Sequence, residues 1–174
     1  MQAPALDDFA SRTRPGTPLV GEDNRVPDMF RNLDLGPIFF SLTNPEPGMP
    51  QSVQWSPEQW KRVVEEYRKF LTLAHEGKGI ATVPSRNVDL VWHTHVLDTA
   101  KYYEDMMNTF GHMVHHYPYF GVASEADRHA LIDAYQNTKQ RYYERFGELA
   151  PEDVWGLAAR CGSSHCSGSR CRTP

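Results

Sequence analysis

Apolar residues recur at spacings of three and four over residues 57–76, which is the clearest pattern in the chain. The repeating positions are Trp60, Val63, Val64, Tyr67, Phe70, Leu71 and Ala74. This spacing places them on one face of an α-helix. Ser56 can cap the helix, with Pro57 in its first turn and Gln59 completing a capping box. Gly77 is a stop signal, so the pattern predicts an amphipathic helix packed against a core.

Two longer helical stretches are predicted in the second half of the chain. The first covers residues 87–110, with a continuation or a new helix capped by Asp98 or Thr99, and Gly111 breaks it. One apolar face of its second part consists of Tyr103, Met106, Met107 and Phe110. The other stretch covers residues 124–146. Its apolar positions are Ala130, Leu131, Ala134, Tyr135, Thr138 and Tyr142.

The remaining segments are short or irregular. A short helix is predicted around residues 28–33, and the apolar run 38–42 is predicted to be an extended or single-turn segment laid on the core. Residues 80–83 are predicted to form an extended link that ends at Pro84, and residues 151–159 could add two final turns. No pair of strands is convincing.

The sequence therefore predicts an all-α fold, a compact multi-helix domain over residues 27–159. An irregular Pro/Gly-rich segment, residues 1–26, precedes the domain, and a flexible tail of Gly, Ser, Arg and Cys, residues 160–174, follows it. A chain of 174 residues suits one ordinary domain, and a hydrophobic fraction of 40% fits a globular core.

Charge and hydropathy exclude two classes of partner. The net charge of -4, with scattered Lys and Arg residues, provides no basic face for nucleic acid. No apolar run approaches the roughly 20 residues that span a bilayer. The N-terminal residues contain no hydrophobic signal-peptide core, so a cytoplasmic protein is expected.

The candidate chemistry lies in a histidine-rich segment, in which five of the eight histidines fall between residues 93 and 116. Neutral imidazole is a common metal ligand. Asp89 and His93 are four residues apart, so they share one face of a helix. The predicted ligands to a divalent metal are Asp89, His93, His112, His115 and His116. Zinc is the first choice of ion, with iron or copper as alternatives, and a set of three or four ligands suits a catalytic ion.

The geometry of this site can be predicted further. Asp89, His93 and one of the pair His115 and His116 are expected to converge on one small volume, because Gly111 lets the chain turn back. His95 should point away from this volume on a regular helix, and it is assigned an outer or acid/base catalytic role. A small pocket is predicted, and its lining candidates are Trp92, Tyr117, Tyr119 and Phe120. A small molecule or peptide is the expected ligand.

Two structural alternatives stand beside the metal site. Asp89 could simply accept a hydrogen bond from His93 and fix a buried polar contact near Trp92. The aromatic residues of segment 117–120 could plug the end of the core rather than wall a pocket. No Gly-rich phosphate loop, G-x-S-x-G elbow or His-Glu-x-x-His pattern offers another chemistry.

The tail offers a non-catalytic alternative. Its three cysteines, Cys161, Cys166 and Cys171, are five residues apart. They could bind a soft metal or be modified by a partner enzyme, with the helical domain serving as a recognition or carrier module. Cysteine catalysis is not expected, because no base is held beside thiols in a flexible tail.

The two histidine blocks resemble a known family. Residues 88–102, which include D-L-V-W-H-T-H, resemble the signature of the glycine-rich domain-containing protein-like family, a domain of unknown function in bacteria and plants. Residues 110–121, with H-H-Y-P-Y-F-G, resemble the second block of its bacterial members. The resemblance extends over residues 33–147 and identifies a domain rather than an activity. Plant relatives in that family are linked to development and RNA-binding partners, which this acidic chain gives no reason to adopt.

Overall fold

The computed structural model describes residues 13–44 and 55–159 of the chain. Within these residues the fold is all-α, as predicted. A single antiparallel bridge, between Ser85 and Ala158, is the only strand-like pairing among them. The helices in chain order are α1 (Asp28–Arg31), α2 (Gly36–Thr43), α3 (Pro57–Glu76), α4 (Arg86–Leu97), α5 (Thr99–Phe110), α6 (Glu125–Phe146) and α7 (Glu152–Trp155).

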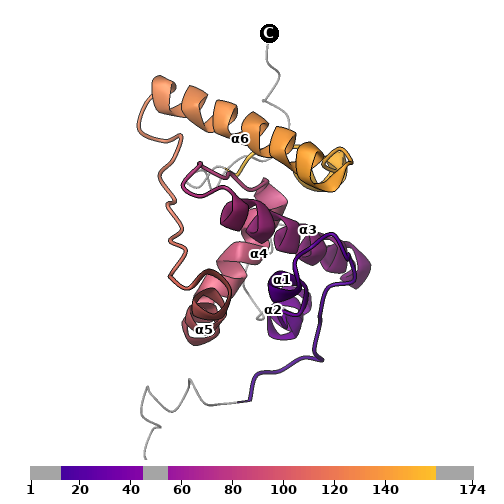
Figure 1. Ribbon diagram of the computed structural model, residues 1–174. Helices are drawn as coiled ribbons and strands as arrows, with labels where there is room; N and C mark the ends of the chain where they lie inside the picture. Colours follow the sequence, from indigo (N-terminus) through magenta and orange to yellow (C-terminus); the bar gives the residue numbers. More distant parts are fainter. Residues whose placement is uncertain (1–12, 45–54, 160–174) are drawn as a thin grey trace, which may run out of the picture.

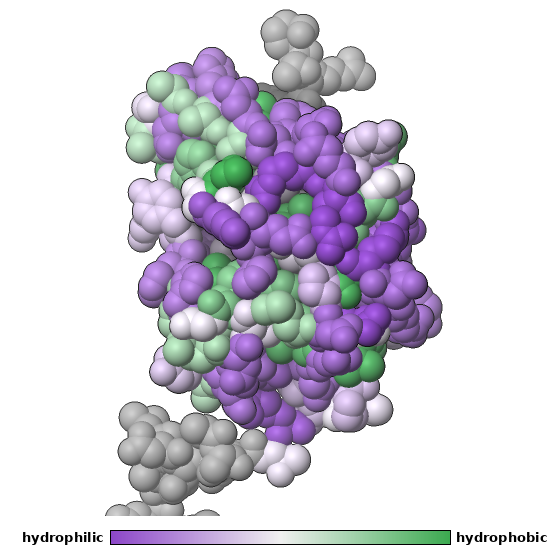
Figure 2. Space-filling model, in the orientation of Figure 1, coloured by the Kyte–Doolittle hydropathy of each residue, from purple (hydrophilic) through white to green (hydrophobic). Residues whose placement is uncertain are grey.

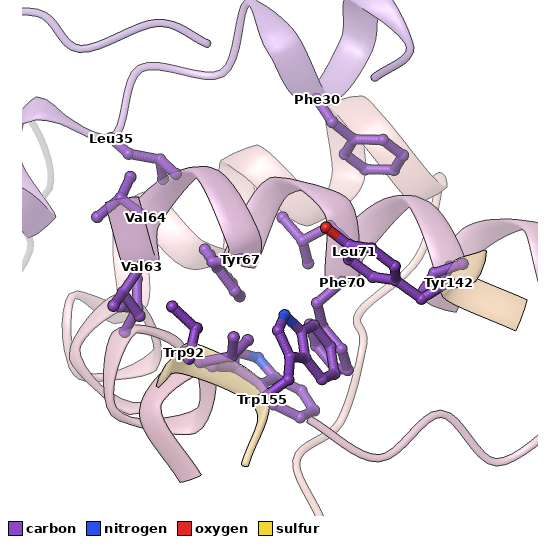
Figure 3. Close-up of a cluster of buried hydrophobic side chains, with 14 of the residues drawn as sticks. Phe30, Leu35, Val63, Val64, Tyr67, Phe70, Leu71, Trp92, Tyr142 and Trp155 are labelled. Atoms are coloured by element: carbon purple, nitrogen blue, oxygen red, sulfur yellow. The ribbon is translucent and has the colours of Figure 1, made fainter. Parts of the chain in front are cut away.

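Helix α3 is the central element, and it contacts α1, α2, α4 and α6 (Figure 1). It begins where the sequence predicts, because Ser56 and Gln59 form both bonds of a capping box. Its apolar stripe is buried, from Trp60 to Leu71, and Ala74 is half-buried. Figure 3 shows side chains of this helix, among them Tyr67 and Phe70, gathered with Trp92 and Trp155 in the core.

The prediction for residues 38–42 was wrong, since they lie inside the eight-residue helix α2. A short apolar run does not distinguish a buried strand from a buried helix turn. Hydrogen bonds hold the backbone where α2 begins: Asp34 Oδ1 accepts from the backbone N–H groups of Leu19 and Gly36. Pro37 then fits the first turn, where no amide hydrogen is needed.

The predicted apolar face of α5 is also corrected. Tyr102 and Met106 are buried, whereas Tyr103 is 56% exposed and Met107 is 39% exposed. The helix packs against α4 through the face that contains Tyr102, one residue before the predicted position. Residues 151–159 form one short helix, α7, rather than two turns, and Trp155 is fully buried with its indole N–H on Glu66 Oε2 at 2.8 Å.

The described part of the N-terminal segment, residues 13–26, is irregular, as predicted, but it packs on the domain. Val26 is buried in the core. Arg14 pairs with Asp98 at the junction of α4 and α5, at 2.5 Å. The tail predicted to be flexible, residues 160–174, lies outside the described residues.

Helix α4 carries the first histidine block, and its start is held firmly. Ser85 is fully buried and caps the helix by accepting a hydrogen bond from the amide of Val88. The backbone on either side of Ser85 pairs with residues 157–159, through Arg86 N–H to Leu157 O and Ala159 N–H to Pro84 O. The end of the described chain is therefore pinned next to the first turn of α4.

No helix in the described ranges is long and apolar enough to cross a membrane. On the face drawn in Figure 2, hydrophilic side chains interrupt the hydrophobic ones. Helix α6 buries one face and exposes charged residues on the other. Helix α3 is buried on nearly all sides from Val63 to Leu73, and its exposed charged residues lie at its two ends.

Candidate metal centre

Two side chains of the site come from α4. Asp89 lies in the first turn and is buried, and His93 follows one turn later. The four-residue spacing puts both on the same face, with His93 Nε2 3.6 Å from Asp89 Oδ2. Because the Ser85 cap fixes where α4 begins, it also fixes the direction in which this face points.

The third side chain, His116, comes from the long segment that joins α5 to α6. Gly111 ends α5 in the left-handed conformation, at φ 74°, which a glycine adopts without strain. The chain then runs back along the domain without regular structure until α6 begins (Figure 1). This return brings His116 opposite α4, where its ring packs on Trp92 at a centroid distance of 4.6 Å.

Together, Asp89, His93 and His116 form a His/Asp group, the metal cluster. His116 Nε2 lies 3.0 Å from His93 Nε2 and 3.0 Å from Asp89 Oδ1. One donor atom of each residue lies within 4.8 Å of the others, so the three could hold a metal ion. A tetrahedral zinc ion with bonds of about 2.0–2.1 Å places its ligand atoms roughly 3–4 Å apart. The observed spacing therefore fits such an ion with little movement.

The close contacts of the three side chains compete for the same nitrogen, His116 Nε2. A neutral imidazole nitrogen carries either one hydrogen or one lone pair. If His116 Nε2 donates to the Asp89 carboxylate, the same hydrogen cannot also point straight at His93 Nε2. The three atoms crowd around one point, which a single proton serves poorly and a cation would serve equally for all three.

A cavity of about 160 Å³ adjoins the metal cluster. Asp89 and His116 lie in its wall, whereas His93 is on the solvent side, with 41% of its side chain exposed. The other lining residues are Ala81, Thr82, Val83, Pro84, Trp92, His115, Tyr117, Pro118, Phe120, Leu131 and Ala159. A metal ion held by the cluster would thus stand between the solvent and a mostly apolar cavity.

The His116 segment is anchored by a short chain of hydrogen bonds. Trp92 Nε1 donates to Tyr102 Oη at 2.9 Å, and Tyr102 donates to the carbonyl of Val114 at 2.5 Å. Tyr102 is buried, and burial raises its pKa, so its proton stays on the hydroxyl. The hydroxyl therefore ties α4 and α5 to the backbone two residues before His116.

We expect Tyr102→Phe to weaken metal binding by about tenfold while the protein stays folded. Removing the hydroxyl releases Val114 and leaves the indole N–H of Trp92 without this partner, at a cost of about 1–3 kcal/mol. Supports of this kind behind metal ligands are worth roughly 10–100-fold in affinity. Zinc titration by calorimetry measures the change. Tyr103→Phe is the matched control, because Tyr103 is exposed on the same helix; equal losses in both variants would contradict the role given to Tyr102.

His95 lies outside the metal cluster, in a second buried network. Its Nε2 is 2.9 Å from Asp105 Oδ2, which Lys101 Nζ also contacts at 2.8 Å. Since a carboxylate only accepts, His95 Nε2 carries the hydrogen and Nδ1 accepts from Tyr67 Oη at 3.0 Å. Burial lowers the pKa of His95, although the bond to Asp105 opposes this effect.

This network joins α3, α4 and α5 through one fully buried imidazole. His95 points away from the metal cluster, as expected for a residue two positions from His93 on a regular helix. With both ring nitrogens hydrogen bonded inside the core, it holds helices together. These surroundings offer no support for the predicted acid/base catalytic role of His95.

The other predicted site residues lie in different surroundings. His112 is exposed and bonds the carbonyl of Phe110, and His115 is exposed at the cavity wall. Neither joins the metal cluster. The ring of His112 turns to the backbone where the segment begins, and His115 is exposed whereas its neighbour His116 faces α4. Trp92, Tyr117 and Phe120 line the cavity as predicted.

Tyr119 does not line the cavity. It is 64% exposed and packs edge-on against Tyr117 outside. The tail thiols Cys161, Cys166 and Cys171 lie outside the described residues.

Several contributors to the site were not predicted. Tyr102 has no local pattern that marks it as an anchor, because its partners are ten and twelve positions away. Leu131 comes to the cavity from α6 and Ala159 from the end of the described chain. Residues this far apart in sequence meet only through the packing of helices, so no spacing rule finds them.

Comparison with known proteins places the cluster inside a family match. A family model described as UCP032817-like matches residues 49–145, more than half of the 174 residues. The matched segment includes all three residues of the metal cluster. No curated protein and no solved structure matches the chain. The resemblance to the glycine-rich domain-containing protein-like family is not addressed by this match and stays a prediction.

Proposed function

The chain belongs to the UCP032817-like family, and we propose that this member is a metal-dependent enzyme that binds one divalent ion through Asp89, His93 and His116. The observation that carries the proposal is the convergence of three donor atoms beside a cavity. Zinc is the expected ion, since two imidazoles and a carboxylate form a common catalytic zinc set. The same set also suits non-haem iron, and copper binds imidazole as well.

The number of donors favours a catalytic ion over a structural one. Structural zinc sites have four protein ligands, whereas catalytic sites have three and leave a position for water or substrate. Among the residues that the structure describes, no fourth His, Cys, Asp or Glu joins the cluster. An ion in this position would polarise a bound ligand or activate a water molecule. Hydrolysis with zinc and oxidation with iron are the two reaction classes that this ligand set serves.

One observation favours a second candidate, a carrier or recognition module. Ala159 lines the cavity, so the tail that follows it starts at the wall of the site. Cys161 is two residues further on and within about 7 Å of reach for an extended chain. A tail thiol could then complete a four-ligand site, or be presented to a modifying enzyme.

Elemental analysis of two purified proteins, the full chain and a variant lacking residues 161–174, separates these candidates. After loading with zinc and dialysis, we expect one ion per chain in both. We also expect the metal-free proteins to melt at nearly the same temperature, because the deleted residues include no large apolar side chain to bury.

Metal lost with the tail would favour the carrier module instead. Absence of metal from both proteins would contradict a metal site altogether, and the cluster would then be a buried polar contact. A large drop in melting temperature on truncation would show that the tail docks on the domain.

A further inference from the structure

We infer that the cavity beside the metal cluster binds a small apolar anion, one ring in size, whose anionic head occupies the open position on the ion. This inference rests on the proposed metal site and adds the class of ligand. It follows from three properties of the cavity: its size, its walls and its charge.

The size corresponds to a single ring. The cavity measures about 160 Å³. An apolar cavity of about 150 Å³ in another protein is known to take up benzene. A ligand with one aromatic ring or a branched chain of similar volume would therefore fill the space, and part of a two-ring ligand would lie outside it.

Most of the lining residues are apolar. Trp92, Phe120 and Leu131 are large apolar residues from three separate parts of the fold, and Val83 and Pro84 line the cavity beside them. Val83 and Pro84 are themselves buried, so their positions are set by the core. The polar lining residues are Thr82, Asp89, His115, His116 and Tyr117, and of these Asp89 and His116 belong to the metal cluster. A ligand would thus bury its ring against the wall and direct its polar group to the ion.

The net charge of the metal-loaded site favours an anionic ligand. Asp89 is the only carboxylate among the described lining residues, and no Lys or Arg lies among them. A divalent ion and one carboxylate leave a net charge of +1, which attracts strongly where the dielectric constant is low. With no side-chain cation in the wall, the ion is the partner available to an anionic head such as a carboxylate or hydroxamate.

The tail is a poorer occupant. Residues 160–174 contain no aromatic residue other than His165 and no Leu, Ile, Val, Met or Phe. They offer little that could replace water against Trp92 and Leu131. A tail thiol could reach the ion without filling the cavity, and probe titrations with residues 161–174 removed distinguish this outcome.

The test uses the full chain loaded with cobalt, whose visible absorption reports changes in its ligands. Three probes with one head group are titrated: acetohydroxamate without a ring, benzohydroxamate with one ring, and 2-naphthohydroxamate with two. We expect benzohydroxamate to bind at least about tenfold more tightly than acetohydroxamate, because benzohydroxamate has a ring that can bury apolar surface in the cavity and acetohydroxamate has none. The naphthyl probe should bind more weakly than benzohydroxamate.

A variant at the rim checks that the cavity is responsible. Ala81 is exposed and lines the cavity, so Ala81→Leu should narrow the entrance. The affinity for benzohydroxamate should then fall at least about tenfold, whereas the affinity for acetohydroxamate should stay the same. Ala126→Leu is the matched control, since Ala126 is exposed on α6 and does not line the cavity. This control should change the affinity for neither probe.

Each alternative result has a distinct meaning. Equal affinities for the three probes in a cobalt-loaded protein would overturn this inference and leave the metal site standing. Probe binding that appears only after residues 161–174 are removed would show that the tail is the native occupant, which also overturns it. A chain that fails to bind cobalt would overturn the proposed function, and the inference with it.

Discussion

Replacing Phe70 with alanine is expected to lower the free energy of unfolding by about 3–5 kcal/mol. Phe70 is 1% exposed, and its ring packs on Trp92 at 5.2 Å and on Tyr67 at 6.3 Å. Truncation removes the buried ring and leaves a space that the rigid helices around it cannot fill. Since a domain of this size is stable by about 5–15 kcal/mol, the loss is a large fraction of the total.

Trp60→Ala is expected to lower the free energy of unfolding by a similar amount, because Trp60 is 6% exposed on the same face of α3. Urea titrations followed by circular dichroism measure both losses. Lys61→Ala is the matched control: Lys61 is exposed on the same helix and makes only a surface ion pair with Glu22, so it should change stability by less than about 0.5 kcal/mol. Losses below about 1 kcal/mol for Phe70→Ala and Trp60→Ala would show that this face of α3 is not the core.

The second large effect concerns metal binding. His116→Ala is expected to weaken zinc binding by more than about 100-fold, beyond the cost of removing a supporting group. It deletes the only member of the metal cluster that comes from the α5–α6 segment. The ion would keep Asp89 and His93, two ligands from one helix, and two ligands hold zinc poorly.

Calorimetric titration gives the affinity directly. Thermal unfolding gives a second readout, since zinc at 100 times its dissociation constant should stabilise the native protein by about 2.7 kcal/mol. The variant should lose this stabilisation. His112→Ala is the matched control, because His112 lies in the same segment, is exposed and stands outside the cluster. Equal losses from both substitutions would refute the assignment of His116.

The positions of the longest helices follow from local information. The capping box at Ser56, the cap at Asp98 and the left-handed glycines at 111 and 147 act within one turn of the backbone. Helical start and stop signals of this kind are visible in the sequence, so both ends of α3 and α6 and the end of α5 were predicted to within a residue or two. The pairing of Asp89 with His93 follows equally, because it depends only on the pitch of the helix.

Short elements were less predictable. The run that forms α2 has the same composition as a buried strand, and its helical start depends on Asp34 bonding to Leu19 fifteen residues earlier. The buried face of α5 was assigned partly one position out, because the adjacent pairs Tyr102–Tyr103 and Met106–Met107 allow more than one apolar face to be chosen. Packing against α4 decides between them.

The sequence by itself determined the helical class, the main helix boundaries and the Asp89–His93 pair, because each depends on contacts between residues close in the chain. Only the tertiary structure decided that His116 rather than His115 completes the metal cluster, and that His95 binds Tyr67 and Asp105 instead. Which residue of the irregular segment 111–124 meets α4 depends on long-range contacts, among them the hydrogen bond from Tyr102 to the carbonyl of Val114. The cavity likewise exists only because α6 and the chain end near Ala159 pack beside α4.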